Sequence, residues 1–244
     1  MGRAIRFFFA ISAYFFFFAS FLYLICFMQD LLVPRSINVG PKASIFIAVL
    51  INLCLVALFG VQHSVMARPS FKAALTRFWP EAIERSLYVA MSALALCVLF
   101  RFWCPMPVLI WTVETEWLRN LLLCLAGLGW VIVLISTFLI NHFELFGLQQ
   151  VWADLRLRET PQSIFREPLF YKLVRHPIYT GFLLAFWSTP DMSQGHLLFS
   201  VGMTAYIFIG IRYEERDLKT NLGEVYVEYT RRVGMVVPGV GRAD

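Results

Sequence analysis

The sequence predicts an all-α integral membrane protein with four transmembrane helices followed by a C-terminal helical hairpin, which makes five to six membrane helices. Three observations support this fold class. Of the 244 residues, 59% are hydrophobic and only 15% are charged, which is too apolar for an ordinary soluble domain. Four apolar runs have about the length needed to cross a bilayer. A fifth apolar region is broken once by turn-forming residues.

The first four runs cover residues 7–28, 43–62, 86–100 and 118–140. The first run follows Arg3 and Arg6, as the apolar core of a signal peptide would. It is longer than such a core and no clear small-residue cleavage site follows it, so we predict a retained first helix. We expect the phenylalanine run Phe15–Phe18 to face lipid and to carry no chemistry.

The last apolar region, residues 178–211, is interrupted by the turn-forming stretch from Thr189 to Gly195. Its two arms contain about 12 and 16 residues, fewer than the roughly 20 that a helix needs to cross the hydrocarbon core. We therefore predict a helical hairpin that is short, tilted or not fully spanning.

The distribution of basic residues predicts the orientation. If the apolar segments cross in turn, one side carries 17 of the 21 Lys and Arg residues, in segments 1–6, 63–85, 141–177 and 212–244. The positive-inside rule places this side in the cytoplasm. We expect a multi-pass protein of the inner (cytoplasmic) membrane with both termini in the cytoplasm.

The length of the chain suits a single membrane domain, 1–244, with a four-helix part at 1–140 and a loop, hairpin and tail at 141–244. Membrane topology accounts for the net charge of +5, so the expected partner is the lipid bilayer and no nucleic acid. The five cysteines form no CxxC pair or ligand cluster, so no metal site is expected. Nothing in the sequence predicts an oligomeric state.

Four short polar motifs lie at the predicted cytoplasmic ends of the helices. The first is Arg175-His176-Pro177-Ile178-Tyr179-Thr180-Gly181. Pro177 favours the first turn of a helix, whose free amide groups can bind an anion, and Gly181 lets a ligand or another helix approach closely. A positively charged membrane anchor that begins with proline is the alternative interpretation.

The second motif, Arg212-Tyr213-Glu214-Glu215-Arg216, ends the last apolar run. In a helix the two carboxylates point about 100° apart, so one can face a pocket while the other pairs with Arg212 or Arg216. Carboxylates are costly beside hydrocarbon and usually belong to a site. A solvated charge run at the membrane edge is the alternative.

The other two motifs cover residues 141–148 and 62–68 and contain His142 and His63. A histidine near its ordinary pKa can accept a proton at neutral pH, but each motif alone is explained as well by an interfacial anchor. All four motifs fall on one predicted face. We therefore expect the helix ends to converge on a pocket there.

Together these residues resemble the isoprenylcysteine carboxyl methyltransferase and phospholipid methyltransferase superfamily. The resemblance rests on the Arg-His-Pro-x-Tyr-x-Gly stretch at 175–181 and on Glu214-Glu215, completed by Gly223, Tyr226, Tyr229 and Pro238. The segments 63–68 and 141–148 narrow the resemblance to the NnrU-like branch and, within it, to bacterial methanethiol S-methyltransferases.

The resemblance implies S-adenosylmethionine as the cofactor at the cytoplasmic face, held by Arg175, His176, Tyr179, Gly181, Glu214 and Glu215. It also implies methyl transfer to a small thiol, with methanethiol becoming dimethyl sulfide. A thiol reacts as its thiolate, so its proton needs an acceptor. We assign the role of base or thiol orienter first to His142 and second to Glu215.

Two other functions are compatible with the sequence. One is methylation of a lipid or of a prenylcysteine carboxylate, which needs a lateral opening for a long chain. The other is a non-enzymatic membrane protein that binds haem or another cofactor through His63, His142 or His176.

Overall fold

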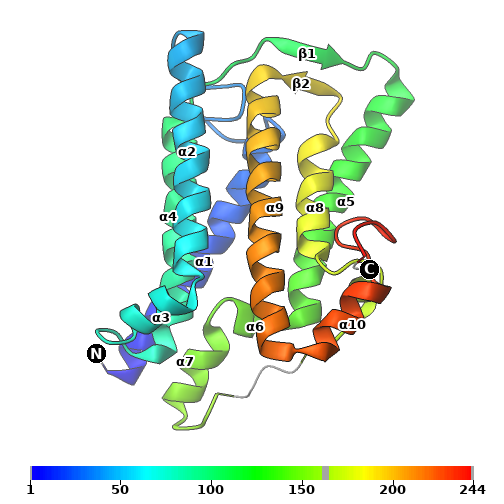
Figure 1. Ribbon diagram of the computed structural model, residues 1–244. Helices are drawn as coiled ribbons and strands as arrows, with labels where there is room; N and C mark the ends of the chain where they lie inside the picture. The colour runs from blue at the N-terminus through cyan, green and yellow to red at the C-terminus, as the bar shows by residue number, and fades with distance from the viewer. Residues whose placement is uncertain (1, 161–164, 243–244) are drawn as a thin grey trace. The chain divides into compact units, whose positions relative to one another are not determined.

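A computed structural model describes residues 2–160 and 165–242 of the chain (Figure 1). Within these ranges the chain is mostly helical, and five helices are long and apolar enough to cross a membrane. They are α1 (Arg3–Met28), α2 (Ile45–Met66), α4 (Glu84–Phe102, preceded by η1, Glu81–Ile83), α5 (Glu116–Ile140) and α9 (Gln194–Leu222). The prediction of an all-α integral membrane fold is confirmed.

The first four of these helices agree with the four predicted runs to within four residues at each end. The expectation for the phenylalanine run is only partly right. Phe15 and Phe16 are exposed, whereas the ring centroid of Phe17 lies 4.4 Å from that of Phe146. One side of α1 therefore packs inside the protein at this point.

The predicted hairpin is present, but its second arm is longer than expected. The first arm is α8 (Pro177–Trp187), and the second arm, α9, continues past the apolar run to Leu222. The added residues are rich in Glu, Arg, Lys and Leu, which favour helix, and contain no glycine or proline. The helix ends at Gly223, whose φ of 58° is available to glycine without strain.

The turn between the two arms contains a short strand, β2 (Asp191–Ser193), which pairs with β1 (Leu109–Thr112). The sequence does not predict either strand, because three or four residues are too few to show a periodic pattern. Arg119 donates hydrogen bonds of 3.0 and 2.7 Å to the two carboxylate oxygens of Asp191. Since α5 follows β1 and α9 follows β2, both helices start at the same end and run in the same direction (Figure 1).

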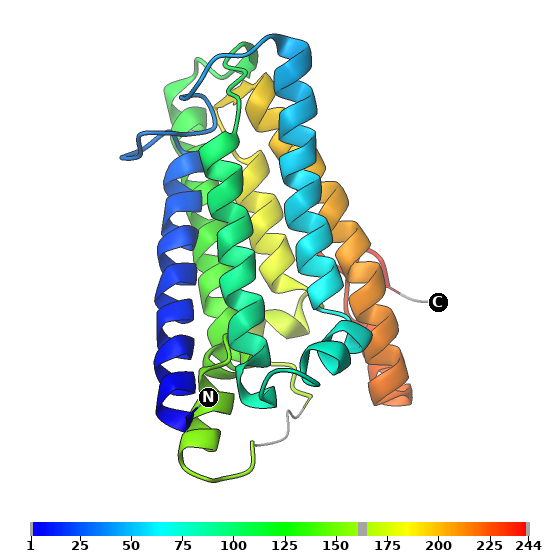
Figure 2. The same cartoon turned by 90° about the vertical axis from the view of Figure 1, so that its left-hand side faces the viewer.

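The chain forms two compact units and passes between them several times. The first unit contains α1, α2, α3 (Pro69–Leu75), η1, α4, α6 (His142–Leu145), α7 (Leu148–Leu155) and the first residues of α9. In this unit α4 packs against both α1 and α2, and α7 packs against α1 (Figure 2). Ala10, Ile83 and Val151 form a buried apolar cluster between these elements.

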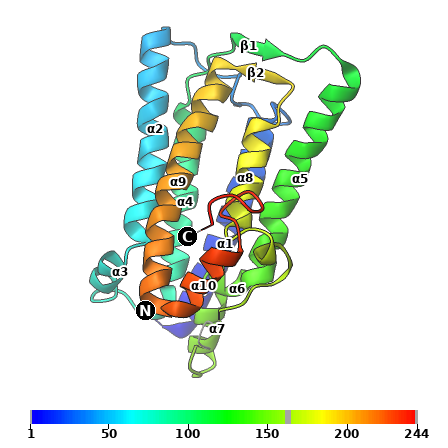
Figure 3. The same ribbon diagram turned by 45° about the vertical axis from the view of Figure 1, so that its right-hand side comes forward.

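The second unit contains β1, α5, η2 (Leu169–Lys172), α8, the rest of α9, and α10 (Glu224–Arg232). In this unit α5 and α8 lie side by side (Figure 3). They approach most closely at Gly129 and Gly181, where a Cβ added to either residue would lie 2.6 Å from the carbonyl oxygen of the other. Neither position has room for a side chain.

Candidate functional site

The first and second motifs meet in the second unit, at the start of α8 and the polar end of α9. Nε of Arg175 lies 2.7 Å from Oε1 of Glu215, and Nε2 of His176 lies 3.1 Å from the same oxygen. The side chain of Arg175 is only 2% exposed, and that of Glu215 only 13%. Buried charges persist when they are paired and hydrogen-bonded, and this pair meets both conditions.

Arg175 also ties the C-terminal segment to the start of α8. Its guanidinium donates hydrogen bonds to the carbonyl oxygens of Thr230 (3.3 Å), Val233 (2.5 Å) and Gly241 (3.1 Å). With Glu215, these acceptors use all three nitrogens of the side chain. The geometry therefore gives Arg175 a positioning role, in which it fixes Glu215 and the segment after α10.

Glu214 is the accessible carboxylate of the pair. Its side chain is 46% exposed, and its Oε2 accepts a hydrogen bond of 3.0 Å from the hydroxyl of Tyr179. Nδ1 of His176 lies 3.8 Å from the same oxygen. Tyr179 and His176 thus orient a carboxylate that a ligand can still reach.

The partner of the buried carboxylate differs from the expected one. Glu215 pairs with Arg175, which is 40 positions earlier in the chain, and not with its helix neighbours Arg212 or Arg216. The local sequence offered only those neighbours. The α8–α9 hairpin brings Arg175 into reach instead.

Gly181 contributes to helix packing. The position of its missing side chain faces Gly129 and Val133 of α5. It therefore sets the place of α8 and, through α8, the places of His176 and Tyr179. Of the two uses that the sequence allowed for this glycine, close approach of another helix is the one observed.

Tyr226 on α10 adds a polar atom that the site assignment from the sequence did not include. The residue is 2% exposed, and its hydroxyl is buried with no hydrogen-bond partner among the described residues. Burial raises the pKa of Tyr226, and the charges of Glu215 and Glu214 raise it further. The hydroxyl is therefore protonated. A buried hydroxyl without an acceptor costs free energy, which a bound ligand would offset.

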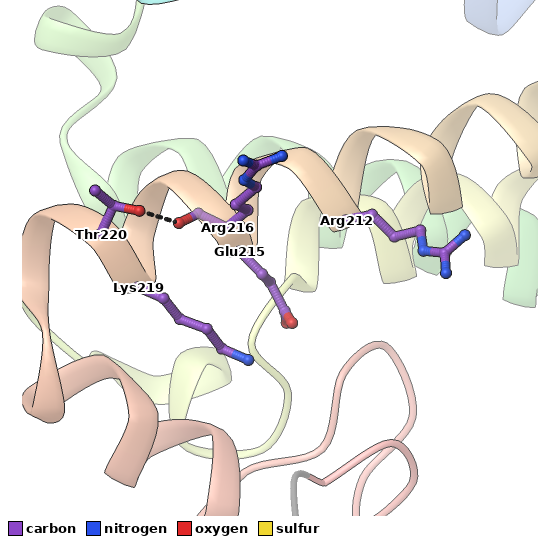
Figure 4. Close-up of a pocket in the computed structure, with 5 residues that line it drawn as sticks. All are labelled: Arg212, Glu215, Arg216, Lys219 and Thr220. Carbon is purple, nitrogen blue, oxygen red and sulfur yellow. Dashed lines mark hydrogen bonds between the residues drawn. The ribbon is translucent and has the colours of Figure 1, made fainter.

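A hollow of about 470 Å³ lies along the last turns of α9 and is lined by Arg212, Glu215, Arg216, Lys219 and Thr220 (Figure 4). Its volume is in the range of small-molecule sites. Across residues 2–160 and 165–242, no group of three His, Cys, Asp or Glu side chains is arranged to hold a metal ion.

His142 belongs to the first unit, where it is 4% exposed. Its Nε2 lies 2.9 Å from the hydroxyl of Tyr14 on α1, and the rings of Tyr14, Phe143 and Phe146 surround it. Burial lowers the pKa of His142 below its ordinary value. The ring is therefore neutral at pH 7 and able to accept a proton.

The two expected proton acceptors, His142 and Glu215, differ in whether a contact within the protein requires them to stay unprotonated. Glu215 carries the negative charge that keeps Arg175 paired, so protonating it would leave a buried cation alone. His142 is neutral, so its protonation would break no ion pair among the described residues. The two residues belong to different units.

His63 of α2 has a structural role in the first unit. Its Nδ1 lies 3.0 Å from Oγ of Ser92, and its Nε2 contacts the hydroxyl of Tyr88. Both partners are on α4, so the histidine joins the two helices. Since the protein uses both ring nitrogens, neither is available to a haem iron.

Tyr14, the partner of His142, is a residue that the sequence alone did not single out. It directly precedes the phenylalanine run of the first helix and belongs to none of the four motifs. Its hydroxyl was the available signal, because a polar group inside a membrane span needs a partner in the protein. Which partner it finds depends on the packing of α1 against a residue 128 positions later in the chain.

Comparisons with known proteins identify relatives over nearly the whole chain. The chain is 49% identical to the methanethiol S-methyltransferase of Pseudomonas sp. strain GM41 over 230 residues, which cover 94% of this chain and 88% of the relative. It is 46% identical to the methanethiol S-methyltransferase of Mycobacterium tuberculosis over 238 residues, 98% of each chain. Nurim of Rattus norvegicus is 31% identical over 177 residues, 69% of this chain and 67% of nurim. No protein-family model and no solved structure matches.

The fold is that of a multi-pass integral membrane protein, with a buried polar cluster at the start of α8. The relatives give the class of reaction, which is methyl transfer. The chain belongs to the methanethiol S-methyltransferase family.

Proposed function

We propose that the protein transfers a methyl group from S-adenosylmethionine to methanethiol and so forms dimethyl sulfide. The observation that carries this proposal is identity of 46% to 50% over nearly the full chain to proteins named methanethiol S-methyltransferase. The cluster of Arg175, His176, Tyr179, Glu214 and Glu215 supports it, since the motifs that suggested the cofactor come together in space.

The groups in and near the cluster fit S-adenosylmethionine. Glu214 offers an accessible carboxylate for hydroxyl or amino donors, and Tyr226 offers a hydroxyl that lacks an acceptor among the described residues. In this proposal Glu214, Tyr179, His176 and Tyr226 line the cofactor site, while Arg175, Gly181 and Glu215 position them. When bound, S-adenosylmethionine supplies a methyl group on a positively charged sulfur, which a thiolate takes to give a thioether.

The chemical task left to the chain is to remove the proton of the thiol. Because Nε2 of His142 already contacts the hydroxyl of Tyr14, the proton passes through that hydroxyl. The thiol proton moves to the oxygen of Tyr14 while the original hydroxyl proton moves to Nε2. Tyr14 ends neutral and His142 ends as the cation, which requires a starting tautomer with its proton on Nδ1.

We also propose that residues 1–244 act as one methyltransferase domain of the inner membrane, with both termini and the cofactor site at the cytoplasmic face. The bias of 17 of 21 Lys and Arg residues toward that face supports this orientation. Glu214 follows the start of α9 by 20 residues, or about 30 Å along the helix. That distance is close to the thickness of the hydrocarbon core, so the carboxylates reach the far interface, where a soluble cofactor can bind.

The comparisons favour methyl transfer over haem binding, because the relatives that cover nearly the whole chain are named methyltransferases. Of the three histidines considered, His63 has both ring nitrogens in contact with protein hydroxyls. Methylation of a lipid or of a prenylcysteine carboxylate is the alternative to methylation of a thiol, and one experiment tests both.

The test is an acceptor panel. Purified protein is incubated with methyl-labelled S-adenosylmethionine and, separately, with methanethiol, a longer thiol, a prenylcysteine and phospholipid. We expect label in the volatile thioether of the small thiol. Label in a prenylcysteine ester or a lipid, with none in the thioether, would show that the acceptor is a carboxylate or a lipid headgroup.

A further inference from the structure

One face of α9 carries two cations that the proposed mechanism does not use. Arg212 and Lys219 lie three residues before and four residues after Glu215, so the three side chains share one side of the helix. Figure 4 shows them pointing to the same side, into the hollow of about 470 Å³. A cation thus flanks the carboxylate on either side.

The charge of this face is positive because its carboxylate is already neutralised. Glu215 accepts a hydrogen bond of 2.7 Å from the buried guanidinium of Arg175 and contacts His176 at 3.1 Å. Arg212 and Lys219 are exposed, and neither has an ion-pair partner among residues 2–160 and 165–242. The face therefore favours an anionic group.

The composition of the hollow points the same way. Its lining contains the guanidinium of Arg212, the ammonium of Lys219 and a carboxylate, Glu215, that already has a partner. Nearby on α10, the buried hydroxyl of Tyr226 has no hydrogen-bond partner in the described part of the chain. Two exposed cations around a neutralised carboxylate suit the anionic end of a zwitterionic molecule.

We infer that Arg212 and Lys219 bind the carboxylate of the methionine part of the cofactor. This inference rests on the proposed function and adds to it which part of S-adenosylmethionine occupies the hollow. The carboxylate is the only anionic group of that molecule. Arginine suits it because a guanidinium can donate two parallel hydrogen bonds to one carboxylate, and Lys219 adds a point charge.

A phosphate group would satisfy the same two cations, and a membrane protein meets phosphate in the headgroups of anionic lipids. The shared chemistry is an oxyanion bound by Arg and Lys. The two sources can be separated with a truncated cofactor analogue. If the cations bind the cofactor carboxylate, they should not contribute to the affinity for an analogue that lacks this carboxylate.

Binding to two ligands separates these cases. S-adenosylhomocysteine carries the amino-acid carboxylate, whereas 5′-methylthioadenosine keeps the nucleoside and lacks the amino acid. Calorimetry in a phosphate-free maltoside detergent measures both affinities for the wild type, Arg212→Gln, Lys219→Gln and the double variant. Arg231→Gln, at an exposed arginine of α10, is the control for loss of a positive charge. A parallel series in bilayer discs with phosphatidylglycerol measures lipid binding.

We expect the double variant to bind S-adenosylhomocysteine about 10- to 100-fold more weakly. Its affinity for methylthioadenosine should be unchanged, and Arg231→Gln should alter neither. Equal losses for both ligands, or no loss for S-adenosylhomocysteine, would overturn the inference. Loss of phosphatidylglycerol binding alone would assign the face to lipid phosphate. If the folded wild type bound neither ligand, the cofactor proposal itself would fall, which is a distinct result.

Discussion

Glu214 and Glu215 are neighbours in sequence with different surroundings, and we expect their glutamine variants to behave differently. Glu215→Gln removes the counterion of the buried Arg175, so the free energy of unfolding should fall by about 3–5 kcal/mol. Glu214→Gln changes a half-exposed group, so the fold should persist while affinity for S-adenosylhomocysteine weakens. Thermal unfolding and calorimetry on the purified variants measure the two effects. Equal melting temperatures for the two variants would contradict this division of roles.

His142 should matter for turnover and not for cofactor binding. His142→Ala should lower kcat at neutral pH by about 10²- to 10⁴-fold, the usual contribution of a general base, with partial recovery at higher pH as free thiolate accumulates. Burial lowers the pKa of His142 below that of a free histidine, so the wild-type ring stays neutral through the pH range in which a free histidine takes up its proton. The wild-type rate should therefore fall only at pH values more acidic than that range, and the variant should lose this acid limb.

Tyr14 provides the matched test of the proton path. Tyr14→Phe should reproduce most of the loss seen in His142→Ala, and the double variant should be no slower than either single one. Tyr23→Phe is the control, because Tyr23 lies on the same helix and donates to the carbonyl of Arg35. A fully active Tyr14→Phe beside an inactive His142→Ala would rule out passage through the hydroxyl and leave His142 as a direct acceptor.

For individual residues, types and spacing predicted that the Arg-His-Pro stretch and the glutamate pair would meet, but not which side chains would pair. The Arg-His-Pro stretch and the glutamate pair flank one hairpin, so their meeting follows from the connection between two adjacent helices. The pairing of Arg175 with Glu215 depends on how the α8–α9 hairpin closes. The other bonds of Arg175 and the unpaired hydroxyl of Tyr226 depend on α10 and the segment after it. No local pattern encodes those contacts.

The packing of α5 against α8 depends on Gly129 and Gly181. Gly127, also on α5, provides a matched control. A Cβ at Gly129 or Gly181 would lie 2.6 Å from backbone atoms of the facing helix, whereas one at Gly127 meets nothing within 4 Å. Gly129→Ala and Gly181→Ala should each lower the free energy of unfolding by about 1–3 kcal/mol, as overpacking does. Gly127→Ala should be neutral or slightly stabilising.

Thermal unfolding of the three alanine variants in one detergent measures this difference. Equal stability for all of them would show that α5 and α8 separate readily, and that Gly181 does not position His176 and Tyr179.

The element boundaries were predictable where apolar length alone decides them, as for α1, α2, α4 and α5. The end of α9 was not predictable in this way. The helix continues to Leu222 through charged residues, whereas the prediction ended where the apolar run ends. The strands β1 and β2 escaped prediction for a different reason. Each is too short to show a pattern, and their pairing joins segments about 80 residues apart.

The proposed topology follows from the way the chain returns at β2. α5 and α9 start beside the two paired strands, so α9 ends on the same side as α5, and α8 together with the residues before β2 makes the return crossing. We expect a reporter fused at residue 244 to read as cytoplasmic and one inserted at residues 191–193 to read as periplasmic. A periplasmic C-terminus would place the Glu214-Glu215 pair away from the supply of cofactor.

The two interleaved units could not be derived from the sequence. Each draws on segments from several parts of the chain, and hydrophobic periodicity is local. The class of fold was predicted from composition and the expected orientation from charge, which are properties of the whole chain.

The central claim is that this protein makes dimethyl sulfide by transferring the methyl group of S-adenosylmethionine to methanethiol. The most direct test supplies the purified protein with methyl-deuterated S-adenosylmethionine and unlabelled methanethiol, and analyses the headspace by mass spectrometry. We expect dimethyl sulfide that carries one deuterated methyl group from the wild type, and much less from Glu214→Gln at low cofactor concentration. Absence of dimethyl sulfide with a folded, cofactor-binding wild type, or formation of unlabelled dimethyl sulfide alone, would contradict the claim.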